Sequence, residues 1–343
     1  MPRAQQGSHR NDHPRRSEDD SKEGGHTAKM VEPLPRTRAL STFSAMRTPP
    51  LLAPGARVAL VAPAGPVSKD GTFHTAVLQA KSFGWEPVTG DNVSARTRYL
   101  AGTDEQRLHD LNAAFQDDTI DGIWCLRGGY GVMRILDGLD TTAMQSRPRA
   151  VIGFSDITAL HTALGKYADV IGYHGPHAAA PLTSFSRDSL TRAVVLGTDS
   201  CGIAPAARTL RPGRAQGRLV GGNLSLLAAL CGTRYAPDYD GAILVIEDVD
   251  EATYRIDRML RQLMLTGALA KLAGIAYGQF TEEGGRANAA SPSREQLLRE
   301  TADIAGVPTL AGIPVGHIDD QWTIPLGAMA ELDADAKSLH VIR

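Results

Sequence analysis

From residue 57 onward, short apolar runs alternate with stretches in which apolar residues recur every three or four positions. The first run, RVALVAPAG, ends in proline and glycine, which is typical of a buried strand. Similar runs occur at residues 122–127, 150–154 and 170–174, and helical spacing occurs at 69–83, 130–139 and from 155 to about 167. Strands that alternate with helices predict an α/β fold with a mostly parallel sheet and helices on both faces.

Glycine, serine and histidine follow the predicted strands at the points where they end. These residues are Gly65, the pair Gly128–Gly129, Ser155 and the pair His174–Gly175. In parallel sheets the functional loops lie at the carboxyl ends of the strands. We therefore expect these residues to line one edge of the sheet.

The second half of the chain follows a weaker and different pattern. Residues 183–217 lack strong periodicity and carry Pro205 and Pro212, which suggests a domain boundary. Beyond it, helical spacing, two more apolar strands and a C-terminal hairpin predict a smaller β-containing domain. We expect an N-terminal α/β domain at 51–200 and a C-terminal domain at 215–343. Residues 1–50 are polar and poor in apolar residues, so we expect a disordered tail.

Length and charge exclude several classes of protein. The chain has 343 residues, enough for about two domains, and its net charge of −2 gives no overall basic field for nucleic acid or anionic lipid. No run of about 20 apolar residues predicts a membrane span, and no apolar segment near the start predicts a signal peptide. The cysteines Cys125, Cys201 and Cys231 lack CxxC spacing, so we expect no zinc cluster and no disulfide framework. This usage fits a reducing cytoplasm.

The stretch RAVIGFSDITALHTAL places Ser155 between a predicted strand and a predicted helix. A sharp strand-to-helix turn there would expose a nucleophilic hydroxyl near the N–H groups of the helix start. A serine at this place is also the expected N-cap of a helix. The local pattern favours the cap and leaves both interpretations open.

Three further features supply partners for a nucleophile. Gly128–Gly129 after a strand allows backbone N–H groups to approach an anion. Glu247 ends the apolar strand LVIED, and His317 follows Gly316 in a predicted loop. Acidic residues crowd around Glu247 without the spacing of a metal site. Together these residues supply the groups that a serine hydrolase needs, and they occur in the order serine, acid, histidine.

These stretches resemble the LD-carboxypeptidases, a serine peptidase family that includes the microcin C immunity peptidases. The matching segments include VALVAPAGPV, GIWCLRGGYGVMRILDGLD, VIGFSDITALH, GYHGP, GRLVGGNLSLLAALCGT, ILVIEDVDEATYRIDRMLRQL and GIPVGH. The resemblance implies a flavodoxin-like N-terminal domain and a Ser155–Glu247–His317 triad, with Glu251 as the rival acid. It also implies an oxyanion hole formed by the backbone N–H groups of Gly129 and Asp156.

The same resemblance implies hydrolysis of the bond before a terminal D-alanine in murein tetrapeptides, in the cytoplasm, by a homodimer without metal or cofactor. The expected partner is a small peptide substrate, and we expect binding to neither nucleic acid nor a membrane. The alternative is a microcin-type immunity peptidase that cleaves a peptidyl or aminoacyl nucleotide, for which Trp322 or Tyr130 would stack on the base. A third alternative is an α/β protein that binds a ligand without catalysis.

Overall fold

The computed structural model describes residues 46–67, 72–281 and 293–342. All of these belong to the compact unit Ser41–Arg343, which is distinct from the unit Met1–Leu40. Most of the predicted tail at 1–50 therefore lies outside the described residues. None of the helices that the structure describes is long and apolar enough to cross a membrane.

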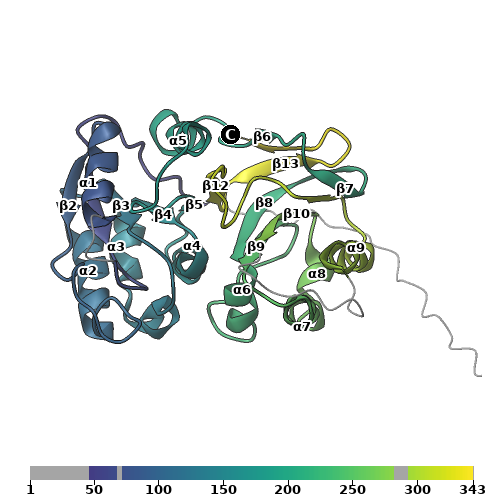
Figure 1. Ribbon diagram of the computed structural model, residues 1–343, viewed down its shortest axis with the longest axis horizontal. Coiled ribbons are helices and arrows are strands. Elements are labelled where there is room, and N and C mark those ends of the chain that lie inside the picture. Colours follow the sequence, from purple (N-terminus) through teal and green to yellow (C-terminus); the bar gives the residue numbers. More distant parts are fainter. Residues whose placement is uncertain (1–45, 68–71, 282–292, 343) are drawn as a thin grey trace, which may run out of the picture. The chain divides into compact units, whose positions relative to one another are not determined.

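The first sheet contains six short strands (Figure 1). They are β1 (Arg57–Val61), β2 (Glu86–Thr89), β3 (Gly122–Cys125), β4 (Ala150–Gly153), β5 (Gly172–His174) and β12 (Ile324–Leu326). Their order is β12-β5-β4-β3-β1-β2, and β1 to β5 are parallel whereas β12 is antiparallel to β5. The order 2-1-3-4-5 is that of flavodoxin-like sheets, so the predicted fold class is confirmed.

Helices cover both faces of this sheet. They are α1 (Thr72–Ser82), α2 (Asp104–Gln116), α3 (Thr141–Ser146), α4 (Thr158–Tyr167) and α5 (Ser184–Thr191), the last continuing into a π-helix at Arg192–Leu196. Successive strand residues point to opposite faces. Ala59 and Val61 therefore pack in the core with α2, α3 and α4, whereas Val58 and Leu60 pack in the core with α1 and α5.

The second sheet is larger and mixed. Its strands are β6 (Gly202–Ile203), β7 (Arg208–Arg211), β8 (Arg214–Asn223), β9 (Ile243–Val249), β10 (Gly274–Thr281), β11 (Thr309–Ala311), β13 (Met329–Asp333) and β14 (Ser338–Val341). They lie in the order β6-β14-β13-β8-β9-β10-β11-β7, with β8 to β11 parallel. The described residues of this part form the helices α6 (Leu224–Leu230), α7 (Thr253–Leu265), α8 (Ala268–Lys271) and α9 (Arg294–Ala305). The predicted C-terminal hairpin is β13–β14.

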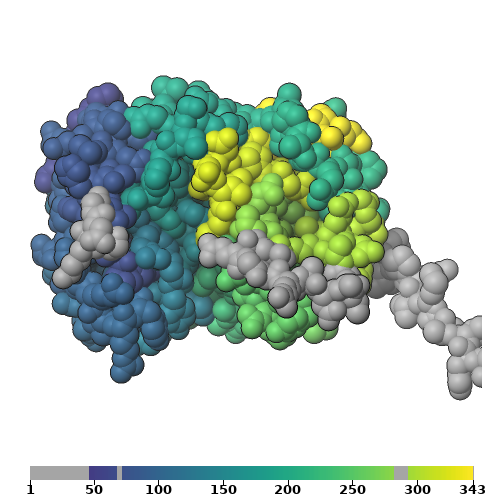
Figure 2. All heavy atoms as spheres, viewed as in Figure 1, coloured from purple at the N-terminus to yellow at the C-terminus, as the bar shows by residue number. Residues whose placement is uncertain are grey.

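The C-terminal segment joins the two sheets. β12 pairs with β5, and the two residues that follow it bind β8. The N–H of Gly327 donates to the carbonyl of Leu219, and the N–H of Leu219 donates to the carbonyl of Ala328. The hydroxyl of Ser186 in α5 donates to the carbonyl of Asp319. In the space-filling view, the yellow surface of this segment lies against teal surface from the first sheet's part (Figure 2). Contacts between the sheets are therefore extensive and polar as well as apolar.

One predicted element is wrong. Residues 130–139 do not form one helix but two single 3₁₀ turns, Val132–Arg134 and Leu136–Gly138. Gly131 has φ 135°, a conformation outside the helical region. The N–H of Val132 is bonded to a side chain, the carboxylate of Asp156. The apolar periodicity is real, but the φ of Gly131 excludes a helix that includes this residue, and the Asp156 carboxylate binds an N–H that the start of a helical turn leaves free.

Candidate active site

Ser155 occupies a strained turn between β4 and α4. Its φ is 61°, a left-handed conformation that is costly for a residue with a β-carbon. A helix N-cap has extended backbone and a side chain bonded to the helix, but Ser155 already lies inside the 3₁₀ turn Ser155–Ile157, which has no side-chain cap. The helix-cap interpretation is therefore wrong, and the backbone has the geometry of a nucleophile elbow.

The glycine loop after β3 lies against Ser155. A β-carbon at Gly128 would lie 2.8 Å from the β-carbon of Ser155 and 3.1 Å from its Oγ, so a side chain at this position would displace the hydroxyl. The carbonyl of Gly128 accepts a hydrogen bond from the N–H of Gly65 at 3.0 Å. Gly129 has φ 115°, which favours glycine. The structure thus brings together the residues that the sequence placed at one sheet edge.

Asp156 joins the elbow to this loop through its carboxylate. Its Oδ2 accepts from the N–H of Val132 at 2.8 Å, and the side chain is buried. Burial raises the pKa of this carboxyl to about 6, although N–H groups of Val132 and Gly131 oppose the rise. The sequence implied a role for the backbone N–H of Asp156 alone. Its side chain could have been suspected only because it follows the serine.

The raised pKa predicts a pH-dependent difference between the wild-type protein and the Asp156→Asn variant. The protonated carboxyl is favoured in the folded state, so its stabilising contribution is present at low pH and declines as pH rises through about 6. Relative to the variant, the wild type should gain about 1–1.5 kcal/mol in free energy of unfolding between pH 7.5 and pH 5. Urea unfolding of both proteins at the two pH values measures this difference. An equal difference at both values would contradict it.

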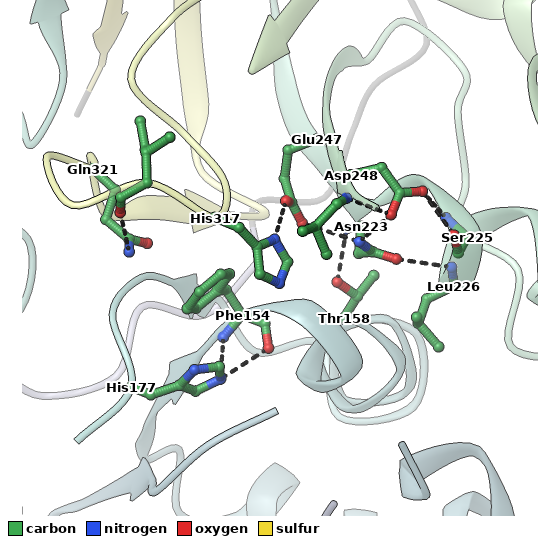
Figure 3. A network of polar contacts seen from close by, with 12 residues as sticks. Phe154, Thr158, His177, Asn223, Ser225, Leu226, Glu247, Asp248, His317 and Gln321 are labelled. Carbon is green, nitrogen blue, oxygen red and sulfur yellow. Dashed lines mark hydrogen bonds and ion pairs between the residues drawn. The ribbon is translucent and has the colours of Figure 1, made fainter. Parts of the chain in front are cut away.

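Glu247 and His317 form a hydrogen-bonded pair. His317 Nδ1 lies 2.8 Å from Glu247 Oε2, and Figure 3 shows the histidine pointing from its loop toward the carboxylate. Glu247 is fully buried, and burial raises its pKa while the bond to His317 lowers it. The rival Glu251 lies at the surface end of this region and pairs with Arg255 at 3.5 Å. The structure therefore joins Glu247, and not Glu251, to the histidine.

A buried polar network fixes the carboxylate of Glu247 from the other side (Figure 3). Asn223 faces Glu247 in the β8–β9 register, and its Nδ2 donates to Glu247 Oε1 at 3.3 Å and to Asp248 Oδ1 at 2.9 Å. The N–H of Asn223 donates to Thr158 Oγ1 of α4 at 2.9 Å. In the sequence, Asn223 occurs only as part of the matching segment GRLVGGNLSLLAALCGT. Its polar role comes from a strand pairing that the sequence does not reveal.

Phe154 connects the histidine to the elbow. Its ring lies 4.8 Å from the ring of His317 in an edge contact and 4.3 Å from the ring of His177 in a stacked one. His177 Nε2 lies 3.0 Å from the carbonyl of Phe154, so it supports the residue before Ser155 (Figure 3). Burial lowers the pKa of His177 to about 3, which keeps it neutral. The sequence pattern singled out the neighbouring pair His174–Gly175 at the strand end, but not His177, which follows it.

Two further histidines, His161 and His174, lie close to the elbow, and in the described part of the chain neither is bonded to Ser155, Glu247 or His317. His161 is buried under the elbow, with Nε2 2.8 Å from the carbonyl of Gly153, and His174 is buried beside Phe154. Trp322 is packed in the core of the second sheet, whereas Tyr130 is exposed beside Tyr99. Within the described ranges, no group of three or more histidine, cysteine or acidic side chains is arranged to hold a metal ion.

Comparisons with known proteins match both halves of this structure. The profile of the LD-carboxypeptidase N-terminal domain matches residues 58–175, and that of the LD-carboxypeptidase C-terminal domain matches residues 216–332. The murein tetrapeptide carboxypeptidase of Pseudomonas aeruginosa is 37% identical over 81% of this chain and 94% of its own length. A probable murein peptide carboxypeptidase of Bacillus subtilis is 36% identical over 86% of this chain and 94% of its own.

Microcin immunity proteins are more distant relatives. The microcin C7 self-immunity protein MccF of Escherichia coli is 26% identical over 82% of this chain and 90% of its own. Among solved structures, a muramoyltetrapeptide carboxypeptidase from Oxalobacter formigenes has a TM-score of 0.75 at 28% identity, covering 83% of this chain and 98% of that one. MccF has a TM-score of 0.79 at 22% identity, covering 86% and 98%. With both domain profiles matched and a 37% identical relative aligned along most of its length, the chain belongs to the LD-carboxypeptidase family.

Proposed function

We propose that this peptidase is a serine-type L,D-carboxypeptidase that releases the terminal D-alanine of murein tetrapeptides. The observation that carries the proposal is the Glu247–His317 pair, held against Phe154 directly before the strained Ser155. The similarity to a relative named murein tetrapeptide carboxypeptidase supports the substrate. The ranges matched by the two family profiles include Ser155, Glu247 and His317.

The proposed reaction is acyl transfer to Ser155. His317 takes the hydroxyl proton as the oxygen attacks the carbonyl carbon of the bond before D-alanine. Glu247 holds Nδ1–H of His317, which leaves Nε2 free to act as the base, and stabilises the imidazolium. His317 then protonates the leaving nitrogen of D-alanine. Water, deprotonated by the same histidine, hydrolyses the acyl-enzyme.

The oxyanion of this reaction would be bound by the backbone N–H groups of Gly129 and Asp156. Asp156 follows the nucleophile at the start of a helical turn, and Gly129 belongs to the loop packed on Ser155. A donor in such a site contributes about 3 kcal/mol to transition-state binding. The Asp156 carboxylate, bonded to Val132, keeps the two donor segments together.

A second candidate function is microcin-type immunity, and the similarity to MccF favours it. Such an enzyme would cleave an aminoacyl or peptidyl nucleotide with the same triad. Of the two aromatic residues suggested by the sequence, only Tyr130 is exposed, because Trp322 is in the core. This candidate therefore depends on Tyr130 for base stacking.

Turnover of two substrates tests the proposal. We expect purified protein to release D-alanine from a murein tetrapeptide, and to leave intact the diastereomer that ends in L-alanine. Aspartyl sulfamoyl adenosine, a compound present in a solved MccF structure, is the competing substrate. Faster cleavage of that compound would replace the first function with the second. Failure to cleave either substrate, with no labelling of Ser155 by a fluorophosphonate, would favour a non-catalytic ligand-binding protein.

A further inference from the structure

Arg127 stands between the end of β3 and the glycine loop. It is the residue immediately before Gly128–Gly129, and its side chain is exposed at the sheet edge that carries Ser155. The mechanism described above uses the backbone of this loop but not the arginine. Its position raises the question of what its charge would bind.

The guanidinium of Arg127 lies across two glycines. A β-carbon at Gly65 would lie 3.4 Å from Arg127 Nε and 3.5 Å from Cζ, and one at Gly129 would lie 4.0 Å from Nη2. Arg127 Nη1 donates to the carbonyl of Pro66 at 3.1 Å, which fixes one side of the group. The charged group is thus held over the loop that carries the proposed oxyanion donor, and its other N–H groups remain to bind a ligand.

The charge of Arg127 is not neutralised by any residue that the structure describes. The two neighbouring arginines differ in this respect. Arg134 is paired with Asp104, and Arg107 is buried, bonded to Asp104 and to the carbonyls of Pro63 and Gly131. The positive charge of Arg127 also acts near the elbow: it contributes to lowering the pKa of His177, which contacts Phe154. An exposed guanidinium that has no acidic partner among the described residues, and that lies beside an oxyanion site, is suited to an anionic part of the substrate.

The substrate of a carboxypeptidase has an anion at a fixed place. Its free carboxylate is separated from the scissile carbonyl carbon by only the amide nitrogen and one α-carbon. When the carbonyl oxygen is at Gly129, the carboxylate must therefore lie within a few ångströms of this loop. We propose that Arg127 binds the terminal carboxylate of the substrate and so restricts the enzyme to the last residue of a peptide. This inference rests on the proposed carboxypeptidase function.

Paired substrates test this role. The wild-type protein and the Arg127→Gln variant are assayed with a tetrapeptide ending in D-alanine and with the same peptide ending in D-alaninamide. For the acid, we expect the variant to lose 10- to 100-fold in kcat/KM, mainly through KM, because a charge-assisted bidentate bond is lost. For the amide, we expect less than a twofold change. Arg127→Lys should restore part of the preference, since it keeps the charge without the planar fork.

A control variant and the activity of the wild-type protein distinguish failure of this inference from failure of the proposed function on which it rests. Arg147, a half-buried arginine paired with Asp121 at the opposite end of the sheet, supplies the control, and Arg147→Gln should leave both substrates unaffected. Equal losses on acid and amide in the Arg127→Gln variant would show a structural role and overturn the assignment of the carboxylate. Failure of the wild-type protein to release D-alanine would overturn the proposed function, and this inference with it.

Discussion

Replacement of Ser155 with alanine is expected to lower kcat for D-alanine release by about 10⁴- to 10⁶-fold, with little change in KM. The nucleophile is removed, but the oxyanion donors and the substrate contacts remain, so binding is retained and some rate above that of water persists. Single-turnover assays with tetrapeptide at high enzyme concentration measure this loss. Undiminished D-alanine release would contradict the assignment of the nucleophile.

A glycine at the same position separates catalysis from folding. Ser155 has φ 61°, and glycine adopts that conformation without the cost of about 1 kcal/mol that a β-carbon imposes. We expect Ser155→Gly to be as inactive as Ser155→Ala but to have the higher melting temperature of the two. A protein that gains stability while it loses activity would show that the strain serves the reaction. Equal melting temperatures for the two variants would argue against strain at the elbow.

Replacement of Glu247 with glutamine is expected to lower kcat by about 10³- to 10⁴-fold. Glutamine keeps the shape and can still accept from Asn223, but its amide would donate to Nδ1 of His317. The histidine would then carry its proton on Nε2, where the base must be free, so the wrong tautomer is stabilised. The pH dependence of kcat/KM, measured with the tetrapeptide, reports on the base directly.

Glu251 provides the control for this substitution. It is the other acid that the sequence suggested, and its partly buried side chain is paired with the exposed Arg255 of α7. Glu251→Gln should therefore retain wild-type activity within about twofold, because a surface ion pair contributes little. Loss of activity in Glu251→Gln, with activity retained in Glu247→Gln, would reverse the choice of acid.

The sequence predicts the first sheet and its functional edge well, because parallel strands have clear local signals. Each apolar run ends at a glycine, serine or histidine, and the rule that strand ends meet at one edge places Gly128 beside Ser155. The pattern also predicts β9, and so the strand position of Glu247. Residues whose roles come from local pattern are thus readily found in the sequence.

Contacts between segments that are distant in the chain cannot be predicted from such local patterns. Asn223 faces Glu247 only because β8 pairs with β9, and the ring of His177 reaches Phe154 only because β5 lies next to β4. The Asp156 carboxylate binds the N–H of Val132, a contact between two loops that the sequence does not reveal. The helix predicted at 130–139 is excluded at its start by Gly131, whose φ of 135° lies outside the helical region. The pattern places Glu247 at a strand end, but the bond to His317 that distinguishes it from Glu251 is again a contact between distant segments.

The return of β12 to the first sheet has a consequence for synthesis of the protein on the ribosome. β5 is complete when residue 174 has been made, but its free edge is covered only by residues 324–326. During the intervening elongation, β5 presents an unpaired strand edge, a feature that promotes association between chains. His317 emerges shortly before β12, so the segment that covers the edge also carries the proposed base. A chain truncated before residue 317 would therefore be both inactive and prone to aggregate.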